Sequence, residues 1–136
     1  PPFEIVTRDG TRRATALPVD ADLAFDAVTR SAVVQGREPI DLRKKPVAAR
    51  LLEVVLAEPA TTFEKDRLFV DVWHVPFRNA SQGSALYKAV ERLAHLLDDD
   101  PRRFFRWDEA GRLVLVAKRP ALLRSPDGAM STDVQE

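Results

Sequence analysis

The stretch SALYKAVERLAHLLD, residues 84–98, decides the fold of this chain. Its apolar residues recur every three or four positions, as one face of an amphipathic helix requires: Leu86, Ala89, Val90, Leu93, Leu96 and Leu97. Polar residues with the same spacing occupy the opposite face: Tyr87, Lys88, Glu91 and His95. The pattern predicts a helix with one buried side. The exposed side belongs either to an ordinary surface helix or to one that recognises a partner.

The chain has 136 residues, which suits one domain large enough to bury a core. It has no cysteine, which excludes disulfides and thiolate metal sites. It has no apolar run long enough to span a bilayer and no signal peptide, so we expect a soluble, cytoplasmic protein with no membrane partner. The first residues are Pro1-Pro2 rather than Met, as in a fragment or a processed product.

The N-terminal third predicts an antiparallel β-meander. Residues 3–8 and 12–17 flank Asp9-Gly10, a dipeptide typical of tight hairpins, and residues 18–21 form a connector. Three short runs with alternating apolar residues predict further strands: 23–26, 31–35 and 39–42.

Two helices are predicted in the middle of the chain. The first covers residues 47–58, and Lys45-Pro46 opens it, since proline is tolerated in the first turn of a helix. Thr61 and Glu64 form a capping-box signature for the second, which runs from 64 to 73. Residues 74–83 form a loop that leads into the third helix, with Ser81 or Ser84 as its cap.

A second hairpin is predicted after the third helix. Residues 102–107 and 112–118 resemble two strands, and the four residues between them end in Gly111. Beyond Pro120 the pattern loses its periodicity, and we expect residues 120–136 to be a disordered tail.

In this order of elements the sequence resembles the winged-helix DNA-binding domain of OmpR/PhoB-type regulators. The resemblance covers most of the chain and rests on the segments LAFDAVTRSAVVQGREPIDL, ATTFEKDRLFVDVW and LYKAVERLAHLL. Within them, Leu68 to Trp73 matches the family's Leu-x-x-x-x-Trp, and Val90-Glu91-Arg92-Leu93 matches its hydrophobic-x-Arg-Leu element. The family's wing usually contains Gly-x-Gly-Tyr. This chain has residues 107–111 in its place, and two of them, Asp108 and Glu109, are acids that would repel phosphates.

The resemblance implies an α+β winged helix-turn-helix fold with an N-terminal antiparallel β-meander, three helices and a C-terminal β-hairpin wing. It divides the chain into an N-terminal hairpin and connector (1–22), a winged-helix domain (23–119) and the tail (120–136). The implied function is that of a transcriptional regulator, or the output module of a larger one. Its third helix would read double-stranded DNA, and further partners would be RNA polymerase or a missing regulatory domain.

Carried over by position, the resemblance implies DNA contacts from the loop, the third helix and the wing. The candidate residues are Arg78, Gln82, Ser84, Tyr87, Lys88, Glu91, Arg92, His95, Arg106 and Arg112. Lys and Arg can donate to guanine or phosphate, Glu can accept from cytosine, and Tyr can contact a thymine methyl or a phosphate.

Other interpretations of the same residues remain open. Lysines and arginines total 21, as do the acids, so no global positive field draws the chain to DNA, and the fold can equally serve as a protein-interaction module. Glu91 can pair with Lys88, and three arginines, Arg102, Arg103 and Arg106, can neutralise the acids at 98–100. Four aromatic residues are candidates for base stacking but more typical of packing: Trp73, Phe104, Phe105 and Trp107.

An enzyme is not expected. The two histidines, His74 and His95, belong to no metal-binding or nucleophile motif, so we expect neither catalysis nor a cofactor.

Overall fold

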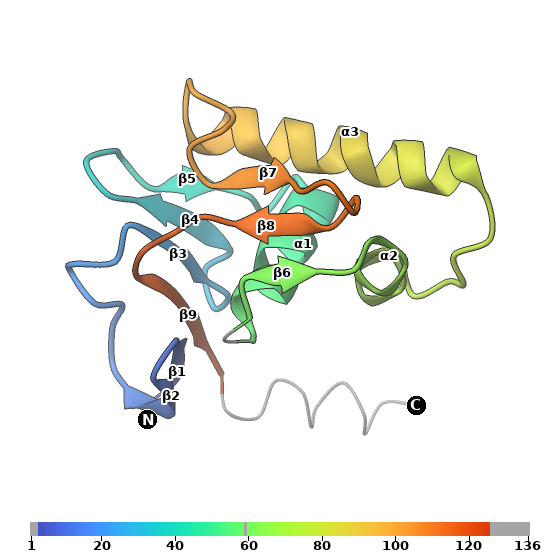
Figure 1. Cartoon of the computed structure of the whole chain (residues 1–136). Coiled ribbons are helices and arrows are strands. Elements are labelled where there is room, and N and C mark those ends of the chain that lie inside the picture. Colours follow the sequence, from blue (N-terminus) through green and yellow to red (C-terminus); the bar gives the residue numbers. More distant parts are fainter. Residues whose placement is uncertain (1–2, 59, 126–136) are drawn as a thin grey trace.

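The computed structural model describes residues 3–58 and 60–125. It confirms the predicted α+β class: helices α1 (Pro46–Leu56), α2 (Lys65–Trp73) and α3 (Ala80–Leu97) pack against a large and a small β-sheet. Figure 1 shows the larger sheet on one side of the molecule, with the helices and the smaller sheet on the other.

The larger sheet contains six strands in the order β2-β1-β9-β3-β4-β5. The predicted N-terminal hairpin is confirmed, because β1 and β2 pair antiparallel across a turn in which Gly10 has a φ of 124°. The next three predicted strands are confirmed with small shifts at their ends. The bounds are β1 Phe3–Thr7, β2 Gly10–Ala14, β3 Leu23–Asp26, β4 Ser31–Val34, β5 Ile40–Asp41 and β9 Pro120–Arg124.

The expectation of a disordered tail from residue 120 is wrong for its first five residues. These form β9, which lies between β1 and β3, antiparallel to the first and parallel to the second. Its side chains are buried on both faces: Leu122 joins the main core, whereas Ala121 and Leu123 join a smaller cluster behind the sheet. A strand buried on both faces shows no alternation of apolar and polar residues, so its sequence carries no periodic strand signal. Residues 126–136 lie outside the described residues.

The larger sheet crosses both predicted boundaries of the chain, at 22/23 and 119/120. β9, which follows the second boundary, hydrogen-bonds with β1, before the first boundary, and with β3, after it.

The smaller sheet has the order β6-β8-β7, from β6 (Thr62–Phe63), β7 (Phe105–Trp107) and β8 (Leu113–Leu115). The predicted C-terminal hairpin is therefore confirmed as the β7–β8 pair. The predicted capping box of Thr61 and Glu64 is wrong. The Thr61 carbonyl accepts a hydrogen bond from Leu115 N at 2.8 Å, so this segment joins the sheet, and Glu64 precedes α2 without a side-chain cap.

The third helix begins earlier than predicted. It starts at Ala80, and its cap is Asn79 rather than Ser81 or Ser84. The Asn79 side chain accepts a hydrogen bond from Gln82 N at 3.2 Å, and the Gln82 side chain accepts one from Asn79 N at 3.1 Å. This reciprocal capping box extends the helix by one turn at the expense of the predicted loop.

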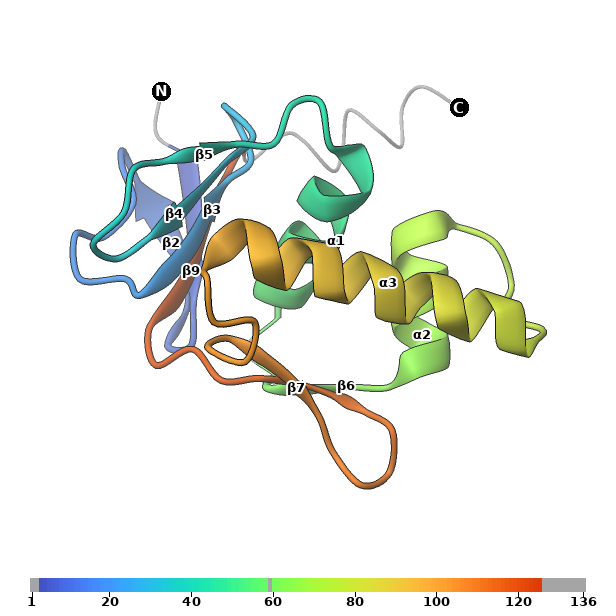
Figure 2. The ribbon, with the colours of Figure 1, turned by 90° about the horizontal axis from the view of Figure 1, so that it is seen from above.

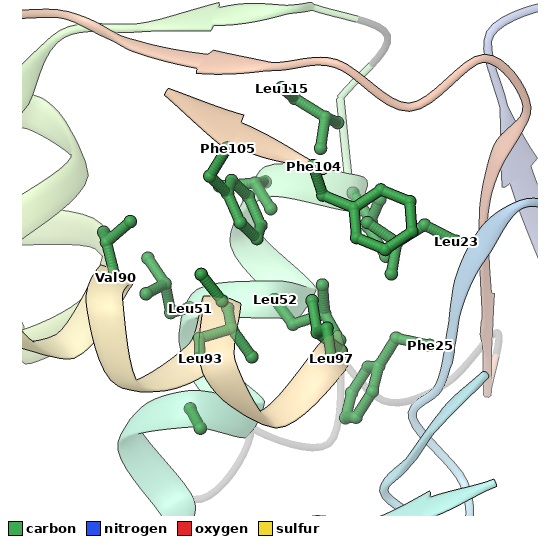
Figure 3. Close-up of a cluster of buried hydrophobic side chains, with 14 of the residues drawn as sticks. Leu23, Phe25, Leu51, Leu52, Val90, Leu93, Leu97, Phe104, Phe105 and Leu115 are labelled. Atoms are coloured by element: carbon green, nitrogen blue, oxygen red, sulfur yellow. The ribbon is translucent and has the colours of Figure 1, made fainter. Parts of the chain in front are cut away.

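The predicted apolar face of α3 is confirmed as the centre of the core. Leu86, Leu93 and Leu97 are completely buried. Figure 3 shows Val90, Leu93 and Leu97 of α3 beside Leu51 and Leu52 of α1, with Leu23, Phe25, Phe104, Phe105 and Leu115 closing the cluster. Burial of each such side chain contributes about 1.5–3 kcal/mol, so this face fixes α3 firmly and leaves its other face outward.

Candidate nucleic-acid interface

The polar face of α3 is uncovered by the described residues. Six residues predicted to contact DNA from this helix are exposed: Ser84, Tyr87, Lys88, Glu91, Arg92 and His95. In Figure 2, seen from above, α3 crosses the molecule with the β6 and β7 side on one flank and α1 on the other. The helix therefore presents its polar side to solvent between these two flanks.

The charged groups on this face are not paired with one another. Within residues 3–58 and 60–125, neither Lys88, Glu91 nor Arg92 makes an ion pair, so the alternative of a Lys88–Glu91 pair is not realised. Two cations and one anion are thus available to an external partner.

Tyr87 lies at the hairpin edge of the face and contacts β7. Its ring centroid is 4.3 Å from that of Trp107, at an interplanar angle of 58°. The Lys65 ammonium, at the start of α2, lies 5.7 Å from the Tyr87 ring centroid. These contacts fix α3 relative to the hairpin and to α2. Sequence analysis missed Lys65 because only the folded chain brings it to Tyr87.

The aromatic residues considered for base stacking are packed instead. Phe104 and Phe105 are buried in the core, and the Trp73 ring stacks on Phe69 with centroids 4.6 Å apart. The packing interpretation is therefore confirmed for these residues, and for Trp107 through its contact with Tyr87.

The two predicted wing arginines differ in their surroundings. Arg112 donates from Nε to Asp108 Oδ2 at 2.9 Å, and its Nη1 lies 4.0 Å from Glu64 Oε2. Arg106 is exposed and has no ion-pair partner among the residues that the structure describes. Arg106 is therefore the more available cation.

Asp108, which the sequence suggests would repel phosphates, organises the hairpin turn. Its Oδ1 accepts hydrogen bonds from Ala110 N and Arg112 N, both at 2.9 Å. The backbone N–H of Arg112, with help from its guanidinium, holds the pKa of Asp108 below its ordinary value. The negative charge of Asp108 is thus largely compensated within the turn.

Two further predicted residues lie at the start of α3: Arg78 in the loop before it and Gln82 in its first turn. Gln82 is occupied by structural hydrogen bonds: besides Asn79 N, its Oε1 accepts from Arg78 N, and its Nε2 donates to Pro76 O at 3.0 Å. The Arg78 side chain is exposed and lines a shallow hollow with Lys65 and Tyr87. Gln82 therefore positions Arg78 rather than presenting its own amide.

The other edge of the face borders a groove of about 1200 Å³ between α3 and the start of α1. Its α1 wall begins with Lys45 and includes Val47, whose side chain is 38% exposed. The α3 wall includes five predicted contact residues: Ser84, Lys88, Glu91, Arg92 and His95. Sequence analysis did not identify the α1 residues as part of this surface.

The acids after α3 are compensated in part by the arginines that follow. Asp98 Oδ2 pairs with Arg103 Nη1 at 3.0 Å, and its Oδ1 pairs with Arg37 Nη1 at 3.2 Å. The Arg103 hydrogen bond holds the pKa of Asp98 below its ordinary value. Neither Arg102 nor Arg106 makes an ion pair among the described residues, so the interpretation that all three arginines neutralise these acids is wrong for both.

The described residues form neither a membrane-spanning helix nor a cluster of metal ligands. In this part of the chain no helix combines the length and apolar character needed to cross a membrane. Nor do residues 3–58 and 60–125 bring together three or more metal-binding side chains.

Comparison with known proteins finds one distant similarity. The chain is 29% identical over 94 residues to "Response regulator MprA" of Mycolicibacterium vanbaalenii, and the match covers 69% of this chain and 39% of that protein. The chain thus spans about two fifths of the length of the curated relative it matches. No family model and no solved structure matches.

Proposed function

We propose that this chain is the DNA-binding output module of a bacterial transcriptional regulator, with the winged helix-turn-helix arrangement of the OmpR/PhoB type. In this assignment α3 enters the major groove, and the β7–β8 hairpin is the wing. The observation that carries the proposal is the exposed polar face of α3, which lies beside the hairpin and contacts it through Tyr87 and Trp107. The similarity to a response regulator supports the same function.

The side chains on α3 provide the chemistry of base recognition. Lys88 and Arg92 have no ion-pair partner among the described residues and can donate to guanine acceptors or to phosphates. Glu91 can accept from a cytosine amino group. Because all three lie on one exposed face, they can reach neighbouring base pairs together.

The hairpin and the loop before α3 supply contacts to the flanks. Arg106 is the cation best placed to hold a phosphate, whereas Arg112 is committed to Asp108. Arg78 extends the basic surface beyond the start of α3.

We also propose that the output module works with other protein parts. Since the chain matches about two fifths of the relative's length, a regulatory domain is a natural partner. The segment between α2 and α3, with Val75 44% exposed, is the candidate contact for RNA polymerase.

A second candidate function is docking of a protein partner by the same fold. It is favoured by the equal numbers of acids and bases in the chain and by the partly exposed apolar residues Val47 and Leu96 in the groove beside α3. Exposed acids at the hairpin, such as Glu109, also suit a basic protein surface better than DNA.

Selection from a random duplex pool separates the two functions. We expect enrichment of one sequence, with an affinity that falls as salt increases. Lys88→Ala should cost about 1–3 kcal/mol if Lys88 contacts a base edge, whereas Lys118→Ala, outside α3 and the hairpin, should have little effect. If neither random nor selected duplex binds at low salt, the DNA-binding proposal is wrong and protein docking remains.

A further inference from the structure

We propose that the DNA footprint extends from α3 across the adjacent groove to Lys45 and Lys44, at the start of α1, which contact backbone phosphates. This inference rests on the proposed function and adds a second strip of contacts, on the flank of α3 that faces away from the hairpin.

The groove has basic residues on both walls. Lys45 lies on the α1 wall, and Lys88, Arg92 and His95 lie on the α3 wall. Among the described residues that line the groove, Glu91 is the only acid. A chain with no net charge therefore concentrates positive charge along this flank, as a polyanion would require.

Neither Lys44 nor Lys45 is needed to neutralise an acid of the described residues, because the lowered pKa of Asp41 is due mainly to Arg43 and least to Lys44. Both are exposed, and neither makes an ion pair within residues 3–58 and 60–125. Lys45 precedes α1, but its side chain makes no capping hydrogen bond. Both ammonium groups are therefore free to bind an anion.

Arg43 provides the contrast within the same segment. Its guanidinium donates to both carboxylate oxygens of Asp41, from Nε to Oδ1 at 3.0 Å and from Nη2 to Oδ2 at 2.9 Å. The positive charge of Arg43 is therefore compensated by the carboxylate of Asp41. The net positive charge of the segment thus comes from Lys44 and Lys45.

The position of these lysines fits phosphate contact rather than base reading. Lysine is a flexible point charge, and contacts to phosphate fix the orientation of a recognition helix without reading sequence. The opposite flank ends in a hairpin with Glu109 and with Arg112 already paired. The phosphates of a duplex therefore meet more unpaired positive charge on the α1 flank than at the tip of the hairpin.

The test compares single and paired variants of the whole chain by fluorescence anisotropy. The probes are a labelled random-sequence duplex and the selected duplex, each titrated over a series of salt concentrations. Lys45→Gln and the double variant Lys44→Gln/Lys45→Gln are compared with Lys118→Gln, an exposed lysine that lies outside the groove. Thermal unfolding of each variant checks that the fold is intact.

We expect Lys45→Gln to weaken both duplexes by the same factor and to lower the salt slope by about 0.9, the value for one phosphate. The double variant should lower it by about 1–2, whereas Lys118→Gln should match the wild type.

Two results would overturn this inference and leave the proposed function intact. In one, the wild type binds duplex and Lys88→Ala weakens it, but the Lys44 and Lys45 variants keep the wild-type affinity and slope. In the other, Lys118→Gln lowers the slope as much as Lys45→Gln, so that the effect is one of overall charge. A wild type that binds no duplex would instead overturn the proposed function.

Discussion

The ring of Tyr87 in α3 meets the ring of Trp107 in β7 with centroids 4.3 Å apart, and this contact connects the proposed recognition helix to the proposed wing. Aromatic pairs of this kind contribute about 0.5–1.5 kcal/mol beyond the area that they bury. We expect a double-mutant cycle of Tyr87→Ala and Trp107→Ala, measured by urea unfolding, to give a coupling energy in this range. Additive effects of the two substitutions would show that the rings do not support each other.

The cap of α3 gives a second prediction. Asn79→Ala should lower the free energy of unfolding by about 0.5–2 kcal/mol, because it removes the hydrogen bond to Gln82 N and opens the capping box. Ser84→Ala is the control, since Ser84 is an exposed residue within the helix, and its change should stay within about 0.5 kcal/mol. A larger loss for Ser84→Ala than for Asn79→Ala would place the helix start where the sequence suggested.

The pairing of Asp98 with Arg103 and Arg37 predicts a pH effect on stability. Because the pKa of Asp98 is lower in the folded chain, the unfolded chain binds the proton more tightly. The stabilisation is therefore fully present above the unfolded pKa of about 3.9, and it is lost as the pH falls through the lower folded value.

Asp98→Asn should remove this component, so that its stability falls less steeply on acidification than that of the wild type. Unfolding midpoints across the acid range measure this dependence. Asp99→Asn, which changes an exposed neighbour, should keep the wild-type dependence. Equal slopes for Asp98→Asn and the wild type would contradict the role given to this ion pair.

The two hairpin arginines should respond differently to substitution. Under the proposed function, Arg106→Gln should lower the salt slope of duplex binding by about 0.9 and leave the thermal midpoint unchanged, because Arg106 is exposed and unpaired within the described chain. Arg112→Gln should lower the thermal midpoint, since it removes the pair with Asp108, and affect the salt slope less. The opposite ranking would mean that Arg112 leaves Asp108 to bind DNA.

Much of the fold could be predicted because its signals are local. The spacing of Leu86, Leu93 and Leu97 defines the buried side of α3 without any knowledge of its neighbours. The Asp9-Gly10 and Gly111 turns likewise indicated hairpins, because few residues other than glycine adopt the backbone angles that these turns need.

The features that sequence analysis missed depend on distant partners. β6 has two residues and exists because β8 pairs with it, so no local pattern distinguishes it from a capping segment. At α3 the sequence suggests Ser81 or Ser84 as the cap, whereas Asn79 takes this position because Gln82 can complete the capping box. The α1 flank of the candidate site, at Lys45, could not be inferred from the α3 pattern because its distance from Lys88 is set by helix packing.

The position of β9 between β1 and β3 has a consequence for how the protein is made. A ribosome must add residues 120–124 before the large sheet can close, although both neighbouring strands lie among the first 26 residues. Until then those two strands have unsatisfied edges, which can pair with other nascent chains. The N-terminal hairpin of this protein is thus synthesised well before β9, and it can join the rest of the large sheet only once β9 is made.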